Sequence, residues 1–284
     1  MKESLMHKKA MTVRFKISRW IPRRYDKTVS QEVKNIYEMK GEGGRYNKIL
    51  TENKKIEEIG KYVAKMYARH YELTLPYLDG GLRLISCKGY PSYIEEMQKM
   101  KDELLTMVEQ IDYDSIIEEA KIALGKRFDP ADYPMNKEDM MLRYKVDVKF
   151  LPLPEVSDVN RIEGIVDEET KRIEIQVRES IHETQVTVMK ELWNRLYDVI
   201  KHIVDRLDES DKIFRDSLIG NVASLCELLP NLNIMEDEDL EKMRREIEQR
   251  LLVDPKLLRE NDDIRKQTYE SAKDILSAMQ GFIK

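Results

Sequence analysis

The sequence has few of the residues that cross-link small extracellular domains or form flexible linkers. Its 284 residues include two cysteines, nine prolines and eleven glycines. Cys87 and Cys226 lie alone in separate segments and make no disulfide framework, so we interpret both as small buried hydrophobic residues in a reducing compartment. The scarcity of proline and glycine predicts a chain that is ordered over most of its length.

The sequence also lacks the apolar segments that carry a chain into or across a membrane. No stretch approaches the roughly 18 consecutive apolar residues of a membrane-spanning helix. The N-terminal residues MKESLMHKKAM are charged rather than apolar, which does not fit a secretory signal. We therefore expect a cytoplasmic protein with no membrane partner.

Apolar residues recur at helical spacing along most of the chain, which predicts a mostly helical protein. One helix is expected from a cap at Thr28 or Ser30 to about Met39, before the glycines of 41–44. The other expected helices are 53–73, 92–125 with a break near 111–114, 136–142, 179–207, 211–229, 236–251 and 254–279. Short connections between the last four predict an antiparallel four-helix assembly.

Alternating apolar and polar residues predict short strands at 12–17, 82–86 and 144–150. A β-hairpin is expected around a turn at 167–170, because Ile162, Gly164 and Val166 precede that turn and Ile173, Ile175 and Val177 follow it. The predicted fold class is therefore α+β, mostly α, with long antiparallel helices and one small antiparallel sheet or hairpin.

This pattern divides the chain into three successive segments, unless all of it forms one domain. A basic arm and helical region is expected at 1–143, a small sheet or hairpin insertion at 144–178, and a helical bundle at 179–284.

Positive charge is concentrated near the N-terminus. Residues 1–55 contain fifteen Lys and Arg against six Asp and Glu, a surplus of nine that leaves −14 for the rest of a chain whose net charge is −5. The surplus is densest between residues 14 and 27, where cations alternate with aromatic rings. The candidate binding residues are Arg14, Lys16, Arg19, Trp20, Arg23, Arg24, Tyr25 and Lys27.

Two interpretations of this basic segment stay open. Cations contact phosphates and exposed rings stack on bases, which is the pattern of single-stranded nucleic-acid binding. Alternatively, Trp20 and Tyr25 are core residues and the cations form a solvated edge, dock on the protein's own acidic half or contact an acidic partner.

No motif assigns a catalytic, cofactor-binding or metal-binding residue. The segment GEGGRYNK (41–48) lacks the spacing of a phosphate-binding loop, and no histidine has a second ligand at a metal-site spacing. The carboxylates around Asp129, Asp132, Glu138 and Asp139 fit helix caps and turns better than a metal or acid–base site. An enzyme with an unrecognised carboxylate site is therefore the third hypothesis, and no cofactor is expected.

Several segments together resemble one family over nearly the whole chain and in the same order. They are GRYNKIL (44–50), YELTLPYLDGGLRLI (71–85), FDPADYP (128–134), FLPLPEVSD (150–158), LWNRLYDVIKHIVDRL (192–207) and KIFRDSLIGNVASLCELLPNLNI (212–234). They are similar to the family called domain of unknown function 3150, found largely in tailed bacteriophages and mobile elements. The resemblance implies a phage-encoded protein of the host cytoplasm, and it brings no catalytic residues.

The resemblance also implies a kind of partner, because members of that family are often encoded near a MoxR-type AAA+ ATPase and a von Willebrand A-like protein. The first hypothesis is thus a non-enzymatic adaptor that binds such a partner through its acidic helical half. Its basic arm would contact DNA, RNA or an acidic surface. The alternative is a nucleic-acid-binding protein of phage DNA metabolism that uses the basic arm. The oligomeric state is left open.

Overall fold

The computed structural model describes residues 3–78, 81–160, 164, 166–208 and 214–282, with side chains from Met6 onward. These residues form two compact units. Unit 1 comprises residues 1–14, 71–93 and 149–284, and unit 2 comprises residues 15–70 and 94–148. The chain passes between the units four times.

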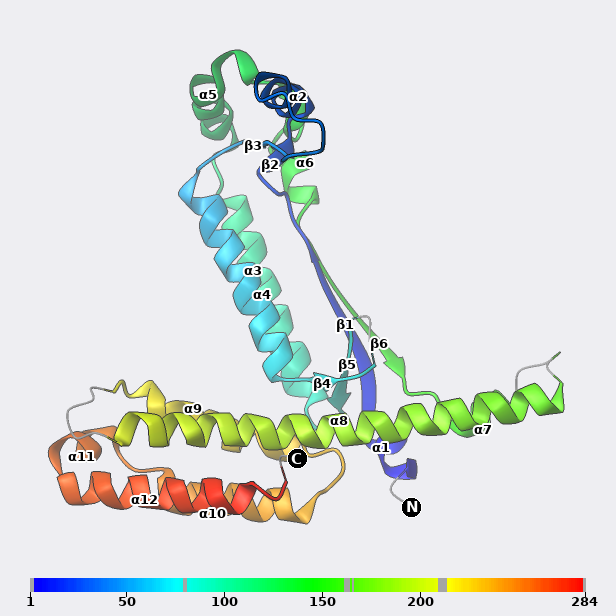
Figure 1. Cartoon of the computed structure of the whole chain (residues 1–284), viewed down its shortest axis with the longest axis vertical. Coiled ribbons are helices and arrows are strands. Elements are labelled where there is room, and N and C mark those ends of the chain that lie inside the picture. Colours follow the sequence, from blue (N-terminus) through cyan, green and yellow to red (C-terminus); the bar gives the residue numbers. More distant parts are fainter. Residues whose placement is uncertain (1–2, 79–80, 161–163, 165, 209–213, 283–284) are drawn as a thin grey trace. The chain divides into compact units, whose positions relative to one another are not determined.

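Unit 1 contains the four-helix assembly that the sequence predicts (Figure 1). Helix α8 packs on α9 and α12, and α10 packs on the same two helices, which closes a ring of four. Each helix turns one apolar stripe inward; α8, for example, buries Leu192, Leu196, Ile200 and Ile203. The helices are α8 (Asp167–Leu207), α9 (Ser217–Leu232), α10 (Glu238–Leu251) and α12 (Asp262–Met279), with the short α11 (Pro255–Glu260) before α12.

A small sheet has the strand order β4-β5-β1-β6. Strands β1 and β5 are antiparallel, with Ala10 opposite Ser86 and Arg14 opposite Leu82, and β4 is antiparallel to β5. The strands are β1 (Ala10–Ser18), β4 (Leu75–Pro76), β5 (Leu82–Ser86) and β6 (Lys145–Pro152); the short helices α1 (Glu3–Lys9) and α7 (Val156–Val159) belong to unit 1. The fold class is α+β and mostly α, as the sequence predicts.

The predicted β-hairpin is wrong in its second strand, which lies in helix α8. Ile173 and Val177 are half-buried and Ile175 is exposed. Residues 173 and 177 are four apart and share a helix face, so the alternation fits a helix as well as a strand. Three acidic residues in the first turn favour the helix start. Ile162, in the first predicted strand, lies outside the described residues.

The two cysteines differ in burial. Cys226 is buried in α9, as expected, whereas Cys87 is exposed, so the prediction for Cys87 is wrong. Burial raises the pKa of the Cys226 thiol to about 11.

Unit 2 is built around two antiparallel helices, α3 (Lys54–Glu72) and α4 (Tyr90–Glu109), which lie side by side (Figure 1). Three polar contacts set their register. The Lys55 amine donates to the Gln110 carbonyl at 2.9 Å, the Tyr62 hydroxyl donates to Glu103 at 2.6 Å, and Arg69 pairs with Glu96 at 2.6 Å. The predicted break in the second helix is also present, because Asp112 caps a separate helix, α5 (Tyr113–Leu124).

The rest of unit 2 contains a two-stranded antiparallel sheet, β2 (Arg23–Tyr25) with β3 (Asn47–Ile49), and the helix α2 (Lys27–Ile36) between these strands in the chain. The N-cap of α2 is Asp26, which accepts from the Val29 amide, and not Thr28 or Ser30. The helix ends before Met39, because Glu38 takes a positive φ of 51° ahead of the glycines. Helix α6 (Lys137–Leu142) precedes β6.

None of the helices described is long and apolar enough to cross a membrane.

Candidate functional site

The basic segment predicted from the sequence leads from β1 through an irregular stretch, residues 19–22, into β2 and the start of α2. The residues of this segment from Lys16 onward belong to unit 2, and Arg14 belongs to unit 1. Five cations of the segment are exposed and form no ion pair within the described part of the chain: Arg14, Lys16, Arg19, Arg23 and Lys27.

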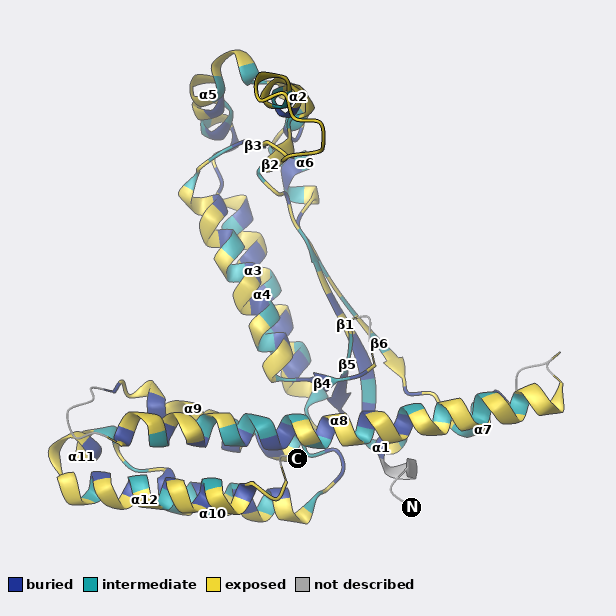
Figure 2. Ribbon diagram, viewed as in Figure 1, coloured by how far each residue is buried: buried dark blue, intermediate teal, exposed yellow. Residues whose placement is uncertain are grey.

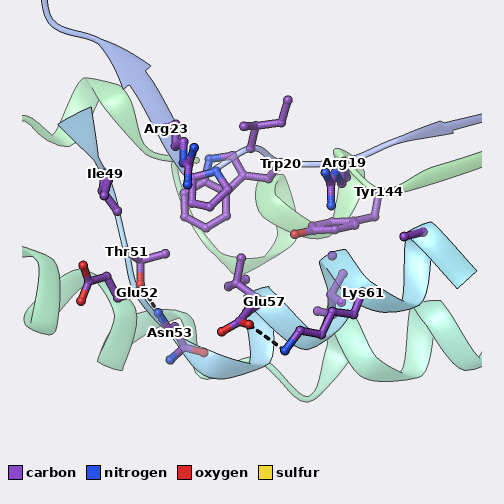
Figure 3. Close-up of a pocket in the computed structure, with 16 residues that line it drawn as sticks. Arg19, Trp20, Arg23, Ile49, Thr51, Glu52, Asn53, Glu57, Lys61 and Tyr144 are labelled. Carbon is purple, nitrogen blue, oxygen red and sulfur yellow. Dashed lines mark hydrogen bonds and ion pairs between the residues drawn. The ribbon is translucent and has the colours of Figure 1, made fainter. Parts of the chain in front are cut away.

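Arg19, Trp20 and Arg23 line a cleft of about 700 Å³ in unit 2, which we call the basic cleft. Helix α3 forms the facing wall through residues that include Glu57, Gly60 and Lys61, and Tyr144 closes one side. Figure 3 shows the Trp20 ring between the strand that carries Arg23 and the helix that carries Glu57. The structure thus brings three of the eight predicted site residues to one cleft.

Trp20 belongs to the floor of the basic cleft and is only 5% exposed. Its ring lies 6.3 Å from that of Tyr133, another buried residue. A ring held in this way cannot stack on a nucleobase, so the core interpretation of Trp20 holds and the stacking interpretation does not. Apolar residues of α3, Ile56, Ile59 and Ala64, also line the cleft.

The Arg19 side chain reaches α3 at the one helical position that has no side chain. A Cβ atom built on Gly60 would lie 3.0 Å from the Arg19 guanidinium. Glycine in a helix interior costs about 0.5–1 kcal/mol relative to alanine, so an isolated glycine there indicates a close approach by another group. In this chain, the approaching group is the guanidinium of Arg19.

The opposite rim of the basic cleft carries both signs of charge. Glu57 pairs with Lys61 at 2.7 Å, and this hydrogen bond lowers the pKa of Glu57. Burial raises the pKa of Tyr144 to about 12, against the smaller effect of the Arg19 charge, so its hydroxyl stays protonated at neutral pH. The cleft therefore offers two unpaired guanidinium groups, a neutral hydroxyl and an apolar floor.

The remaining cation of the predicted segment, Arg24, has a structural role. Its guanidinium contacts Asp132 at 3.2 Å, and Lys48 on the neighbouring strand pairs with the same carboxylate. Lys48 is 7% exposed and also donates to the Arg127 carbonyl at 2.9 Å. Arg24 and Lys48 thus hold the β2–β3 sheet to the loop that contains Asp132.

Tyr25, in contrast to Trp20, is half-exposed on β2. The Arg45 guanidinium lies 5.8 Å from its ring centroid, and Tyr46 beside it is also half-exposed. This pair of rings with an arginine is available for contact with another molecule.

Asp129 and Asp139 cap and turn the chain around the loop 128–134, as expected, and Asp139 also forms an ion pair. Asp129 accepts from the Ala131 amide, and Asp139 accepts from the Met135 amide and pairs with Arg143 at 2.8 Å. Across the part of the chain that the structure describes, no three His, Cys, Asp or Glu side chains come together as metal ligands.

Sequence reasoning missed the far side of the basic cleft. Tyr144 lies more than a hundred residues along the chain from Arg19, and no local pattern connects the two. Gly60 was the available signal, because it is a single glycine in the interior of a predicted helix.

Comparison of the chain with protein-family models, with curated proteins and with solved structures finds no match.

Proposed function

We propose that the chain is a non-enzymatic interaction protein that holds a protein partner at the basic cleft. The observation that carries this proposal is the pair of unpaired guanidinium groups, Arg19 and Arg23, above an apolar floor. Arginine beside a concave apolar surface is typical of protein–protein contact sites, where it binds carboxylates with two parallel hydrogen bonds. The carboxylates of an acidic partner segment would pair with the two guanidinium groups, and its apolar side chains would cover the apolar floor.

The composition of the basic cleft favours protein over nucleic acid. The aromatic ring at its floor is buried and cannot stack on a base, so the cleft lacks the stacking contact that single-stranded nucleic acid needs. The resemblance described above suggests the MoxR-type AAA+ ATPase, or the von Willebrand A-like protein encoded with it, as the partner.

The test is co-expression of the tagged chain with that ATPase, followed by co-purification. Arg19→Ala/Arg23→Ala removes both free cations from the cleft, and we expect it to reduce co-purification by about tenfold or more. The matched control, Lys99→Ala/Lys126→Ala, removes two exposed cations that do not line the cleft. Equal co-purification of both variants would contradict the proposal.

A nucleic-acid-binding role is the second candidate, and the exposed Tyr25 and Tyr46 beside Arg45 favour it. It predicts that a single-stranded oligonucleotide is retarded on a gel at low salt and released steeply as salt rises. Arg19→Ala/Arg23→Ala/Arg24→Ala would abolish the retardation. Absence of a retarded band at low salt would eliminate this candidate.

A further inference from the structure

Helix α2 is strongly amphipathic, yet it does not bury its apolar side. Val29, Val33, Ile36 and Tyr37, the helix C-cap, follow one another at spacings of four, three and one, which places them on one face. We call these four residues the α2 stripe. Its last two members, Ile36 and Tyr37, are 72% and 70% exposed, and Figure 2 shows most of α2 as exposed.

The only residue that α2 buries is Ser30. The Ser30 hydroxyl donates to the Asp26 carbonyl at 2.7 Å and accepts from the Tyr46 amide at 2.9 Å. Ser30 follows Val29 by one residue and is therefore rotated from it by about 100° around the helix axis. The helix is thus fastened to its own unit by a polar residue beside the stripe, and the C-terminal half of the stripe stays exposed.

An amphipathic helix of a folded protein normally turns its apolar face toward the core. Exposed apolar side chains that lie contiguously, with aromatic residues among them, indicate an interaction surface. The exposed fractions of Ile36 and Tyr37 take all described residues into account, so no described residue covers most of these two side chains, whereas Val29 is partly buried.

Charge around the α2 stripe indicates what covers it. Arg23, Lys27, Lys34 and Lys40 form no ion pair among the residues described here. Of the nearby acids, Asp26 caps the helix, Glu32 pairs with Arg127 at 2.8 Å and Glu42 pairs with Arg45 at 3.4 Å, which leaves Glu38 unpaired. The surroundings of the stripe are therefore net positive, and two copies of it would repel each other.

We propose that the α2 stripe is the docking site for an acidic amphipathic helix of a protein partner. A row of side chains at i, i+4 spacing forms a ridge that fits the groove of a second helix. Carboxylates beside the apolar face of that helix would meet the unpaired cations. This inference rests on the proposed function, since it describes the chemistry of the partner that the chain is proposed to bind.

The experiment uses two fluorescent helical peptides of about fifteen residues. One carries leucines at helical spacing with glutamates elsewhere, and the other has lysine in place of every glutamate. Fluorescence anisotropy with the full chain is expected to show binding of the acidic peptide alone. Ile36→Ser/Tyr37→Ser should weaken that binding by about tenfold or more, and Val33→Glu, which adds a charge of the peptide's own sign, should do the same.

The matched control is Ile122→Ser/Met135→Ser, which removes two side chains of the same unit that are even more exposed, at 86% and 88%. It should leave binding unchanged. The inference would be overturned if the chain bound the acidic and the lysine peptides equally well. It would also be overturned if Ile36→Ser/Tyr37→Ser and the control variant bound the acidic peptide with equal affinity. A dimer of the chain in sedimentation that Ile36→Ser/Tyr37→Ser dissociates, or an oligonucleotide that binds the stripe in place of the peptide, would overturn it as well.

Co-purification with the ATPase separates this inference from the proposed function. If co-purification is lost with Arg19→Ala/Arg23→Ala but kept with Ile36→Ser/Tyr37→Ser, the inference is overturned and the proposed function still stands. If both variants still co-purify with the ATPase, the inference and the proposed function are both overturned.

Discussion

The α8 helix of unit 1 and the α2 helix of unit 2 have the same kind of sequence pattern and use it differently. Helix α8 buries its stripe, including Leu196 at 1% exposure, among α9 and α12. Helix α2 buries one serine. Amphipathicity alone therefore shows only that another surface covers the apolar face of a helix. Whether that surface belongs to the same chain depends on residues distant in the sequence.

Charge shows the same contrast between the two regions. In α10 of unit 1, Glu241 is held by Arg244 at 2.7 Å and Arg245 at 2.8 Å. At the basic cleft of unit 2, Arg19 and Arg23 have no acidic partner among the described side chains. Paired charges stabilise the helix that carries them, whereas unpaired ones remain available for a ligand.

The largest expected effect is in the bundle. Leu196→Ala leaves a cavity at a site that is 1% exposed, and such changes cost about 2–5 kcal/mol. Urea unfolding followed by circular dichroism should show this loss. A loss below about 1 kcal/mol would mean that the bundle core is not packed as described.

The next effect concerns the buried ion pair of Lys48 with Asp132. Asp132→Ala removes the carboxylate that Lys48 and Arg24 share, and Lys48 keeps only its bond to the Arg127 carbonyl. We expect a loss of about 2 kcal/mol in the free energy of unfolding, because a hydrogen bond to a buried charge is worth about that much. Lys99→Ala, at an exposed position, is the control and should cost less than about 0.5 kcal/mol.

The helical part of this fold could be predicted because its signals are local. The apolar stripe of Ile56, Ile59, Val63 and Met66 predicts a helix over 53–73, and the observed helix runs over Lys54–Glu72. Asp112 marks the break between α4 and α5 through its capping side chain. Each of these signals lies within a few residues of the feature that it determines.

The remainder of the fold and site depended on distant contacts. Alternation at Ile173, Ile175 and Val177 predicted a strand, but 173 and 177 also share a helix face, and only the surrounding structure selects between the two. The basic segment was predicted, but which of its cations stay unpaired depends on Asp132, which pairs with Arg24 and leaves Arg19 and Arg23 free.

A smaller effect should appear in the pH dependence of the free energy of unfolding. Hydrogen bonds from Arg244, and then from Arg245, lower the pKa of Glu241 from 4.5 to about 2 against the effect of burial. Its contribution to stability is therefore complete above about pH 4.5 and is lost as the pH falls toward 2.

Glu241→Gln tests this directly. At pH 7 the variant should be about 1 kcal/mol less stable than the wild type. The difference should close as the pH is lowered to about 2. A difference that is constant between pH 7 and pH 2 would contradict the ionic origin of the effect.

The smallest expected effect is at the cleft wall. Gly60→Ala should stabilise α3 by up to about 1 kcal/mol, reduced by the displacement of Arg19 from its 3.0 Å approach. We expect a net gain of about 0.5 kcal/mol together with weaker partner binding. A net loss of stability would instead indicate that Arg19 is held rigidly as part of the core.

We claim that unit 2 leaves the apolar face of α2 exposed for a partner, whereas unit 1 buries the apolar faces of its helices in its own core. The most direct test is the free energy of unfolding of Ile36→Ser/Tyr37→Ser, measured beside Leu196→Ala. We expect no change beyond about 0.5 kcal/mol for the α2 variant, the usual range for exposed positions. A loss as large as that of Leu196→Ala would show that the α2 stripe belongs to the core of this chain and would contradict the claim.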